Sequence, residues 1–448
     1  MCIRDSTHPR WNHEDVTHAD GGGDPASAAP PAATAERDRV LDAVKAFALA
    51  VVVLAHSIAW DVSSGDPKSV LDVRPDIAWA TWTLQILPLF FAAGAVANLG
   101  SWQRNPDAAT FLRRRLVRLA TPGLVYAAFW TLLLLPLAAF LPEAELAGRF
   151  LAQLLWFLGV YGAAVVAVPW TARWARRPVL TLGIWLGVIV VVDVVRLTAV
   201  PAVGWLNLVL VWVWLHQLGY HLPQLRRLRP ARLVGLAVVP LALALALALP
   251  GPYSSSLVTH AGDPEPSNLS PPTVVVALYG LAQILVLCAL WPRLKRLLDR
   301  ERVWLATGFI AMRAISVYLW HIPWVLIVAA TAWLLDFGAE PLDRLWWLAH
   351  LAGLAVILTM AWFTAGIGAR WDQRAARWGA SQRPRILPAA PFAILIPVSL
   401  LAMTVTGFGT WWDVAFLGIP TSSALNLAVL AVAWWALTVG RQDTNRSP

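Results

Sequence analysis

The sequence has little charge and almost no cysteine. Asp, Glu, Lys and Arg make up only 14% of its 448 residues, whereas 58% are hydrophobic. Because soluble domains carry about a quarter charged residues, this composition predicts an integral membrane protein with the lipid bilayer as its surroundings. The two cysteines, Cys2 and Cys288, provide neither a disulfide framework nor a thiolate metal site, so we expect no metal.

Motifs of several other protein classes are also missing. No Gly-rich phosphate loop and no alternating strand pattern interrupts the apolar runs, and no secretory signal segment precedes residue 39. Residues 1–36 are polar and then Ala/Pro-rich, which predicts a disordered cytoplasmic tail. Its opening, MCIRDS, is expected to be translated sequencing-adapter sequence rather than native chain, so Cys2 is given no role.

What the sequence does contain is a series of long apolar runs. A bilayer core of ~30 Å requires roughly 20 apolar residues per helix. The expected fold class is therefore all-α, a polytopic membrane helix bundle of about twelve transmembrane helices. The spans are predicted near 40–60, 78–100, 117–140, 150–170, 179–196, 203–221, 233–250, 273–291, 313–335, 345–369, 387–406 and 420–440.

The basic residues alternate between the segments that connect these spans. Most of the 35 Lys and Arg residues fall before the first span, after the last span and in every second loop between them. The positive-inside rule places these segments, and both termini, in the cytoplasm. Because the basic residues set topology, the net charge of +9 does not predict a nucleic-acid partner.

The first span, RVLDAVKAFALAVVVLAHSIAW at 39–60, carries three polar side chains that a simple anchor would not need. At ~100° per residue, Lys45 and His56 lie about 20° apart around the helix, and Asp42 lies about 40° to the other side of His56. This stripe should face protein or water rather than lipid. An alternative is an Asp42–Lys45 ion pair at the inner interface, with His56 bonded inside the bundle.

An arginine run, FLRRRLVRLATP at 111–122, begins the third span. Arg114 and Arg118 are four residues apart and share one face, with Arg115 beside them. Such loops commonly determine topology or contact lipid headgroups. The more specific hypothesis is phosphate recognition, because guanidinium groups form bidentate contacts with phosphate.

Two further segments place polar residues within spans. In AISVYLWHIPW at 314–324, His321 is predicted at mid-membrane before a helix-perturbing proline, with Tyr318 three residues earlier. In LNLVLVWVWLHQLGYHL at 206–222, Asn207 and His216 fall on opposite faces, so His216 and Gln217 are expected to line a separate wall. A lone buried histidine is more often structural than catalytic.

In combination, these segments resemble the acyltransferase 3 family of multi-span membrane O-acyltransferases. The resemblance rests on the first helix, on LPLFFAAG at 87–94 (Phe-Phe-x-x-Gly), on RRLVR at 114–118 (Arg-x-x-x-Arg) and on ISVYLWHIP at 315–323 (Tyr-x-x-His-x-Pro). LWFLGVY at 155–161 and HQLGY at 216–220 are similar to an actinobacterial branch. The similarity covers residues 37–370, and leaves 371–448 as a basic cytoplasmic loop with two extra transmembrane helices.

The resemblance implies an enzyme of the bacterial cytoplasmic membrane that moves an acyl group, usually acetyl, from cytosolic acyl-CoA to a hydroxyl of a glycan, lipid-linked sugar or small molecule. It implies His56 as catalytic histidine, Arg114 and Arg118 as donor-site arginines, and His321 as a late functional position. Lys45 departs from the family, because many members carry Arg there and Lys cannot form a bidentate fork.

We therefore expect neutral His56 to act as general base, with Lys45 orienting the donor or stabilising the oxyanion and Asp42 holding Lys45. Arg114, Arg115 and Arg118 are the predicted cofactor contacts. The predicted substrate contacts are His321, Tyr318, His216, Gln217 and Asn207. One alternative is a transporter or flippase, which would predict a repeat between the two halves; we find none. A second alternative is a non-catalytic membrane scaffold, which would tolerate simultaneous loss of His56 and Arg118.

Overall fold

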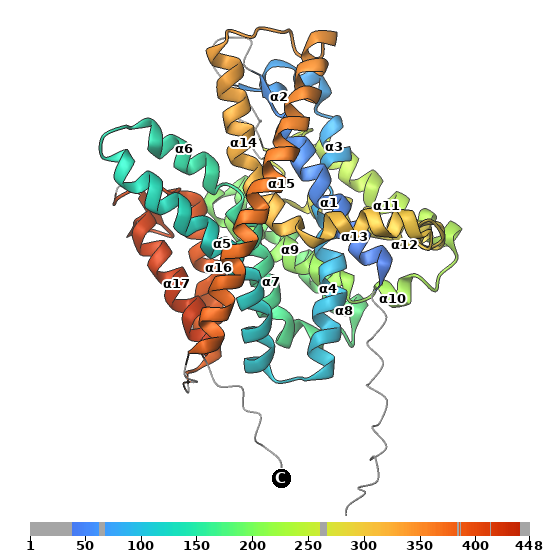
Figure 1. Ribbon diagram of the computed structural model, residues 1–448. Helices are drawn as coiled ribbons and strands as arrows, with labels where there is room; N and C mark the ends of the chain where they lie inside the picture. Colours follow the sequence, from blue (N-terminus) through green and yellow to red (C-terminus); the bar gives the residue numbers. More distant parts are fainter. Residues whose placement is uncertain are drawn as a thin grey trace, which may run out of the picture. The chain divides into compact units, whose positions relative to one another are not determined.

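The helices and connections of this fold are described by a computed structural model for residues 38–61, 68–259, 267–382, 385, 387–412 and 414–439. The tail predicted at 1–36 lies outside the described residues. From Arg39 onward the chain forms a single unit. Its elements are almost all helices, and Figure 1 shows them bundled around α1 (Arg39–Ile58), α4 (Leu87–Arg104) and α9 (Asn207–Gly219).

The predicted fold class is confirmed. Within the described residues, eleven helical segments are long and apolar enough to cross a membrane, and the shorter α17 (Ser423–Val439) occupies the twelfth predicted position. The other helices are α2 (Val70–Val73), α3 (Ala80–Leu84), α5 (Ala108–Ala138), α6 (Glu143–Ala152), α7 (Leu155–Trp174), α8 (Pro178–Thr198), α10 (Leu222–Leu225), α11 (Pro230–Ala248), α12 (Val274–Leu298), α13 (Glu301–Met312), α14 (Ala314–Leu334), α15 (Arg344–Ser381) and α16 (Ala389–Thr406).

Local sequence signals explain where many of these helices begin. Pro178 and Pro230 occupy the first turns of α8 and α11, where the missing N–H costs nothing. The Asp107 and Thr273 side chains accept hydrogen bonds from the first backbone amides of α5 and α12. Two 3₁₀ helices, η1 (Pro75–Ile77) and η2 (Pro201–Leu206), connect longer helices. The described strands form two short antiparallel hairpins, β1–β2 (Trp60–Asp61 with Lys68–Ser69) and β3–β4 (Val414–Phe416 with Ile419–Thr421).

The first helix has one polar and one apolar face. Phe47 and Leu54 are exposed along its outer side, whereas Asp42, Lys45 and His56 are partly buried on the opposite side. That side packs against α4, α12, α13, α14 and α15. The polar stripe therefore faces other helices rather than lipid, as its spacing predicts.

Helix α13 was not predicted as an element of its own. Residues 301–312 form a helix that packs on α1 and α12 and lies across the direction of α14 in Figure 1. Arg39 fixes the junction, because its Nη1 donates to the Leu298 carbonyl at 3.2 Å and its guanidinium stacks on Trp304. The apolar run alone could not separate this helix from α14, because the break at Arg313 contains neither Gly nor Pro.

The last two helices are attached to the rest of the bundle by α5 and α7. Helix α16 packs on α7 and α5, and α17 packs on α5 and α16. The Arg113 guanidinium, buried at 5% exposure, donates to the carbonyls of Ala436, Leu437 and Leu387. It thus caps the C-terminal end of α17, where free carbonyls favour a cation.

Helix α15 is longer than predicted. It continues to Ser381, so the first part of the segment predicted as a basic loop is helical. Residues 371–381 contain no proline, and Trp378 stacks on Trp434 of α17 at 6.2 Å between ring centroids. Tertiary packing on α17 thus extends α15 beyond the apolar run.

We expect Arg113→Ala to lower the free energy of unfolding by about 3 kcal/mol, because charge-assisted hydrogen bonds to buried carbonyls are lost. Arg118→Ala removes an exposed arginine from the same helix and serves as the control. Thermal unfolding in detergent and limited proteolysis of α16 and α17 would measure the difference. Equal melting temperatures for the two variants would contradict the capping role.

Candidate active site

Two histidines from opposite ends of the chain meet inside the bundle. His56, near the end of α1, and His321, in the second turn of α14, are 265 residues apart in sequence, yet His56 Nδ1 lies 3.0 Å from His321 Nε2. Their rings stack with centroids 5.2 Å apart. His321 is fully buried, whereas His56 is partly exposed.

The hydrogen-bond partners assign the tautomers of both rings. His321 Nδ1 lies 2.6 Å from the Tyr318 carbonyl, which can only accept, so His321 Nδ1 carries the proton. His321 Nε2 is then an acceptor, and His56 Nδ1 must be the donor to it. The proton of neutral His56 is therefore on Nδ1, and its Nε2 lone pair is free to accept a proton.

Tyr318 contributes its backbone to this arrangement. Its hydroxyl donates to the Leu154 carbonyl at 3.0 Å and the side chain is 3% exposed. The hydroxyl thus ties α14 to the junction between α6 and α7, while the carbonyl orients His321. The predicted role of Tyr318 as a substrate contact stays a prediction.

Asp42 and Lys45 form an ion pair on the first turns of α1, with Lys45 Nζ 3.9 Å from Asp42 Oδ1. Both side chains are partly exposed, at 15% and 26%. Eleven residues of helix separate Lys45 from His56, which amounts to ~16 Å along the axis. The two groups are therefore not in contact, and only an elongated molecule lying along α1 could touch both.

The arginines at the beginning of α5 differ in their surroundings. Arg114 and Arg118 are exposed and Arg115 is partly buried; the Arg114 guanidinium donates to the Ser101 hydroxyl, and Arg115 Nη2 donates to the Ala97 carbonyl at 2.5 Å. Arg104 adds a further positive charge, which lies close enough to Arg115 to repel it electrostatically. Such a concentration of positive charge is a suitable site for a multiply charged anion.

His216 lies in a second buried polar cluster. Asn98 Nδ2 is 3.0 Å from His216 Nε2 and 3.3 Å from the Tyr161 hydroxyl. His216 Nδ1 and both amide atoms of Gln217 are buried without a hydrogen-bond partner among the described residues. Such groups are costly when left unpaired, which favours a bound water or ligand at this cluster.

Aromatic contacts connect the two clusters. The Tyr318 ring lies 5.2 Å from Phe157, Phe157 lies 6.4 Å from Tyr161, and Tyr161 lies 6.3 Å from His216. The histidine pair and the His216 cluster therefore share one packed wall, formed by α7. The Ala97 carbonyl of α4 accepts from Arg115, and the next residue, Asn98, contacts His216. The His216 cluster therefore lies close to the arginines.

Asn207 lies in a different cluster. It is fully buried, and its Nδ2 donates to Asp193 Oδ1 at 2.8 Å and to the Ile189 carbonyl at 3.3 Å. Asp193 Oδ2 also accepts from the Tyr253 hydroxyl and the Val274 amide. The structure does not bring Asn207 to the histidine pair, and these contacts suit a role in joining α8, α9 and α12.

Three residues of this region are not among those predicted from the sequence: Asn98, Ser101 and Tyr161. Asn98 and Ser101 are polar residues within an apolar span, a signal that could have singled them out. Tyr161 packs directly against Gly94. A Cβ at position 94 would overlap the Tyr161 hydroxyl, so only glycine leaves room for this side chain. That pairing links two distant motifs, and only the packing of α4 on α7 reveals it.

Comparison with known proteins gives a match for most of the chain. A family model described as an acyltransferase domain matches residues 38–366. No curated protein matches the chain, and no solved structure does. The matched segment includes the histidine pair, the Asp42–Lys45 pair, the arginines and the His216 cluster, whereas α16 and α17 lie outside it.

Histidine tautomers can be measured directly. We expect nitrogen NMR spectra of histidine-labelled protein to show both His56 and His321 neutral with the proton on Nδ1, because the Tyr318 carbonyl fixes the order of donors. Spectra of His56→Asn and His321→Asn assign the two signals. A signal from His56 with the proton on Nε2 would contradict the assignment.

Proposed function

The chain belongs to the acyltransferase 3 family, and we propose that it transfers an acyl group, acetyl in the first instance, from cytosolic acyl-CoA to a hydroxyl of a glycan, lipid-linked sugar or small molecule. The observation that carries this proposal is the His56–His321 pair, which leaves one basic nitrogen free. We place the protein in the bacterial cytoplasmic membrane, with both termini and the beginning of α5 on the cytoplasmic side.

The donor would bind at the arginines of α5. Coenzyme A carries several phosphate charges, and guanidinium groups hold phosphates through paired hydrogen bonds. Arg114 and Arg118 are exposed on one helix face, with Arg115 between them. His216 and Gln217, whose buried polar atoms have no partner among the described residues, would hydrogen-bond the amide-rich arm of the donor.

The histidine pair suits base catalysis. His56 Nε2 takes the hydroxyl proton as the acceptor oxygen attacks the thioester carbonyl, and a new C–O bond forms. The C–S bond then breaks, and the coenzyme A thiolate receives the proton from His56. During the attack His321 Nε2 accepts a hydrogen bond from His56 Nδ1–H, which orients the ring and stabilises the imidazolium, as the carboxylate of a catalytic triad does.

Lys45 is better placed for holding the donor than for stabilising an oxyanion. An oxyanion donor must lie about 3 Å from the developing charge, whereas ~16 Å of helix separates Lys45 from His56. The Asp42 carboxylate, 3.9 Å from Lys45 Nζ, holds the ammonium on the inner part of α1. Lys45 would therefore contact the donor along its length.

We expect His56→Ala to insert and fold normally but to lose acyl transfer by about 10³-fold or more, because general-base catalysis contributes about 10²–10⁴. His321→Ala should lose about 10²-fold. His321→Gln should recover part of that loss, because the Gln carbonyl can accept the His56 Nδ1 proton. Transfer from radiolabelled acetyl-CoA to extracted envelope material measures all three; undiminished transfer by His56→Ala would contradict the assignment of the base.

The arginine hypothesis can be separated from the chemistry by changing the donor. Arg114→Ala and Arg118→Ala should each raise the KM for acetyl-CoA about tenfold, because each removes a charged hydrogen bond to phosphate. The same variants should use acetyl-N-acetylcysteamine, which lacks phosphate, as well as the wild type does. Equal losses with both donors would show that these arginines act on folding rather than on phosphate binding.

A further inference from the structure

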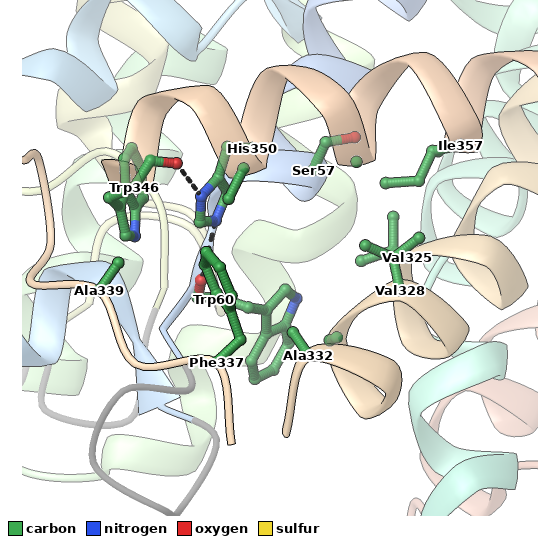
Figure 2. Close-up of a pocket in the computed structure, with 13 residues that line it drawn as sticks. Ser57, Trp60, Val325, Val328, Ala332, Phe337, Ala339, Trp346, His350 and Ile357 are labelled. Atoms are coloured by element: carbon green, nitrogen blue, oxygen red, sulfur yellow. Dashed lines mark hydrogen bonds between the residues drawn. The ribbon is translucent and has the colours of Figure 1, made fainter. Parts of the chain in front are cut away.

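A pocket lies between the C-terminal end of α1, the second half of α14 and the first turns of α15. Figure 2 shows Ser57 and Trp60 on one side, Val325 on the side of α14, and Trp346, His350 and Ile357 along α15. Its cavity volume is about 80 Å³, so it encloses a few carbon atoms and leaves the rest of any ligand outside.

The pocket lies about one helical turn from the histidine pair, and neither histidine is among its lining residues. Ser57 follows His56 directly in α1, and Val325 follows His321 by four residues, so it lies on the same face of α14, ~6 Å along the axis. A molecule seated in the pocket would therefore present its near end to His56. The donor would approach from the other direction, because the Asp42–Lys45 pair lies toward the opposite end of α1.

The pocket lining is apolar and uncharged. Its residues include no Asp, Glu, Lys or Arg. The Ser57 hydroxyl donates to the Val53 carbonyl at 2.8 Å. Both nitrogens of His350 face backbone carbonyls, at 2.9 Å from Trp346 and 3.2 Å from Trp60 (Figure 2). The Ser57 hydroxyl is thus engaged, whereas a neutral His350 ring can donate to only one of its two carbonyls, so its other nitrogen has no donor there.

One donor in the lining has no partner. Trp346 is 3% exposed, and its Nε1–H is buried without a hydrogen-bond partner among the described residues. A buried indole N–H normally has a partner, so an oxygen of a bound molecule would satisfy it. A sugar ring enclosed here would bring several hydroxyl groups to a wall with one free donor, and each unpaired hydroxyl would lose its hydration without compensation.

We propose that this pocket binds the apolar portion of the acceptor, and that the acceptor is a lipid-like alcohol rather than a free polysaccharide. This inference rests on the proposed acyl transfer and narrows its acceptor class. The hydroxyl lies toward His56, and an ether or ester oxygen accepts from Trp346 Nε1–H. Exposed apolar side chains beside the pocket, which suit access from the bilayer, are Trp333, Leu334, Leu335, Leu345 and Leu348.

Photolabelling tests the binding without requiring activity. The probe is a long-chain monoalkylglycerol with a diazirine in its alkyl chain, added to the full-length protein in membranes. We expect label in peptides from 320–357 and at least a tenfold loss in Ala329→Trp, which fills the pocket. Ala330→Trp, the matched control on the exposed side of α14, should keep the label.

Trp346→Phe provides a second variant should Ala329→Trp fail to fold. It keeps the ring but removes the N–H, and should lower labelling about fivefold, the factor carried by one hydrogen bond. Equal labelling of Ala329→Trp and Ala330→Trp, or of Trp346→Phe and wild type, would overturn the pocket assignment. Label found only outside 320–357 would do the same.

The product of the reaction separates this inference from the proposed function. With radiolabelled acetyl-CoA and native membranes, we expect the new ester in the organic-solvent extract and its loss in Ala329→Trp. Label in water-soluble polymer alone would overturn the lipid-like acceptor while leaving acyl transfer intact. Normal photolabelling with no ester in either fraction would instead count against the proposed function.

Discussion

The backbone carbonyl of Tyr318 determines the chemistry of the buried histidine pair. Because a carbonyl can only accept, it fixes the proton of His321 on Nδ1, and His321 in turn fixes the proton of His56 on Nδ1. One hydrogen bond to the Tyr318 carbonyl thus determines the proton positions on both rings, and with them the lone pair on His56 Nε2. A peptide group of α14, which has no charge to desolvate, thus orients both rings.

The same need to satisfy polar groups inside a membrane explains most other polar positions. Asp193 accepts hydrogen bonds from Asn207, Tyr253 and the Val274 amide, and Arg113 donates to three carbonyls. These hydrogen bonds join helices that are far apart in the sequence. His216 Nδ1, Gln217 and Trp346 Nε1 are buried without partners among the described residues. Unpaired groups are costly in a low-dielectric interior, and the proposed donor and acceptor would supply hydrogen-bond partners to these three residues.

The sequence predicts the spans and the inward orientation of the α1 stripe because both depend on local periodicity and composition. It also identifies His56 and His321 singly. It could not bring them together, because the contact depends on the axial register of α1 against α14, and apolar helix surfaces allow many registers. For the same reason Arg113 and Arg114 look alike in sequence, although one is a buried cap on α17 and the other is exposed. Asn98 could have been predicted as a candidate site residue, because it is a polar residue in an apolar run.

The buried cap formed by Arg113 has a consequence for reading related chains. A guanidinium at that place is tolerated because the final turn of α17 and Leu387 surround it with carbonyl oxygens. In a homologue that stops after the equivalent of α15, the same side chain would lose these acceptors and would lie with the other arginines at the exposed beginning of α5. Where the two extra helices are present, an uncharged residue at that place would instead leave the last carbonyls of α17 and the Leu387 carbonyl without this donor.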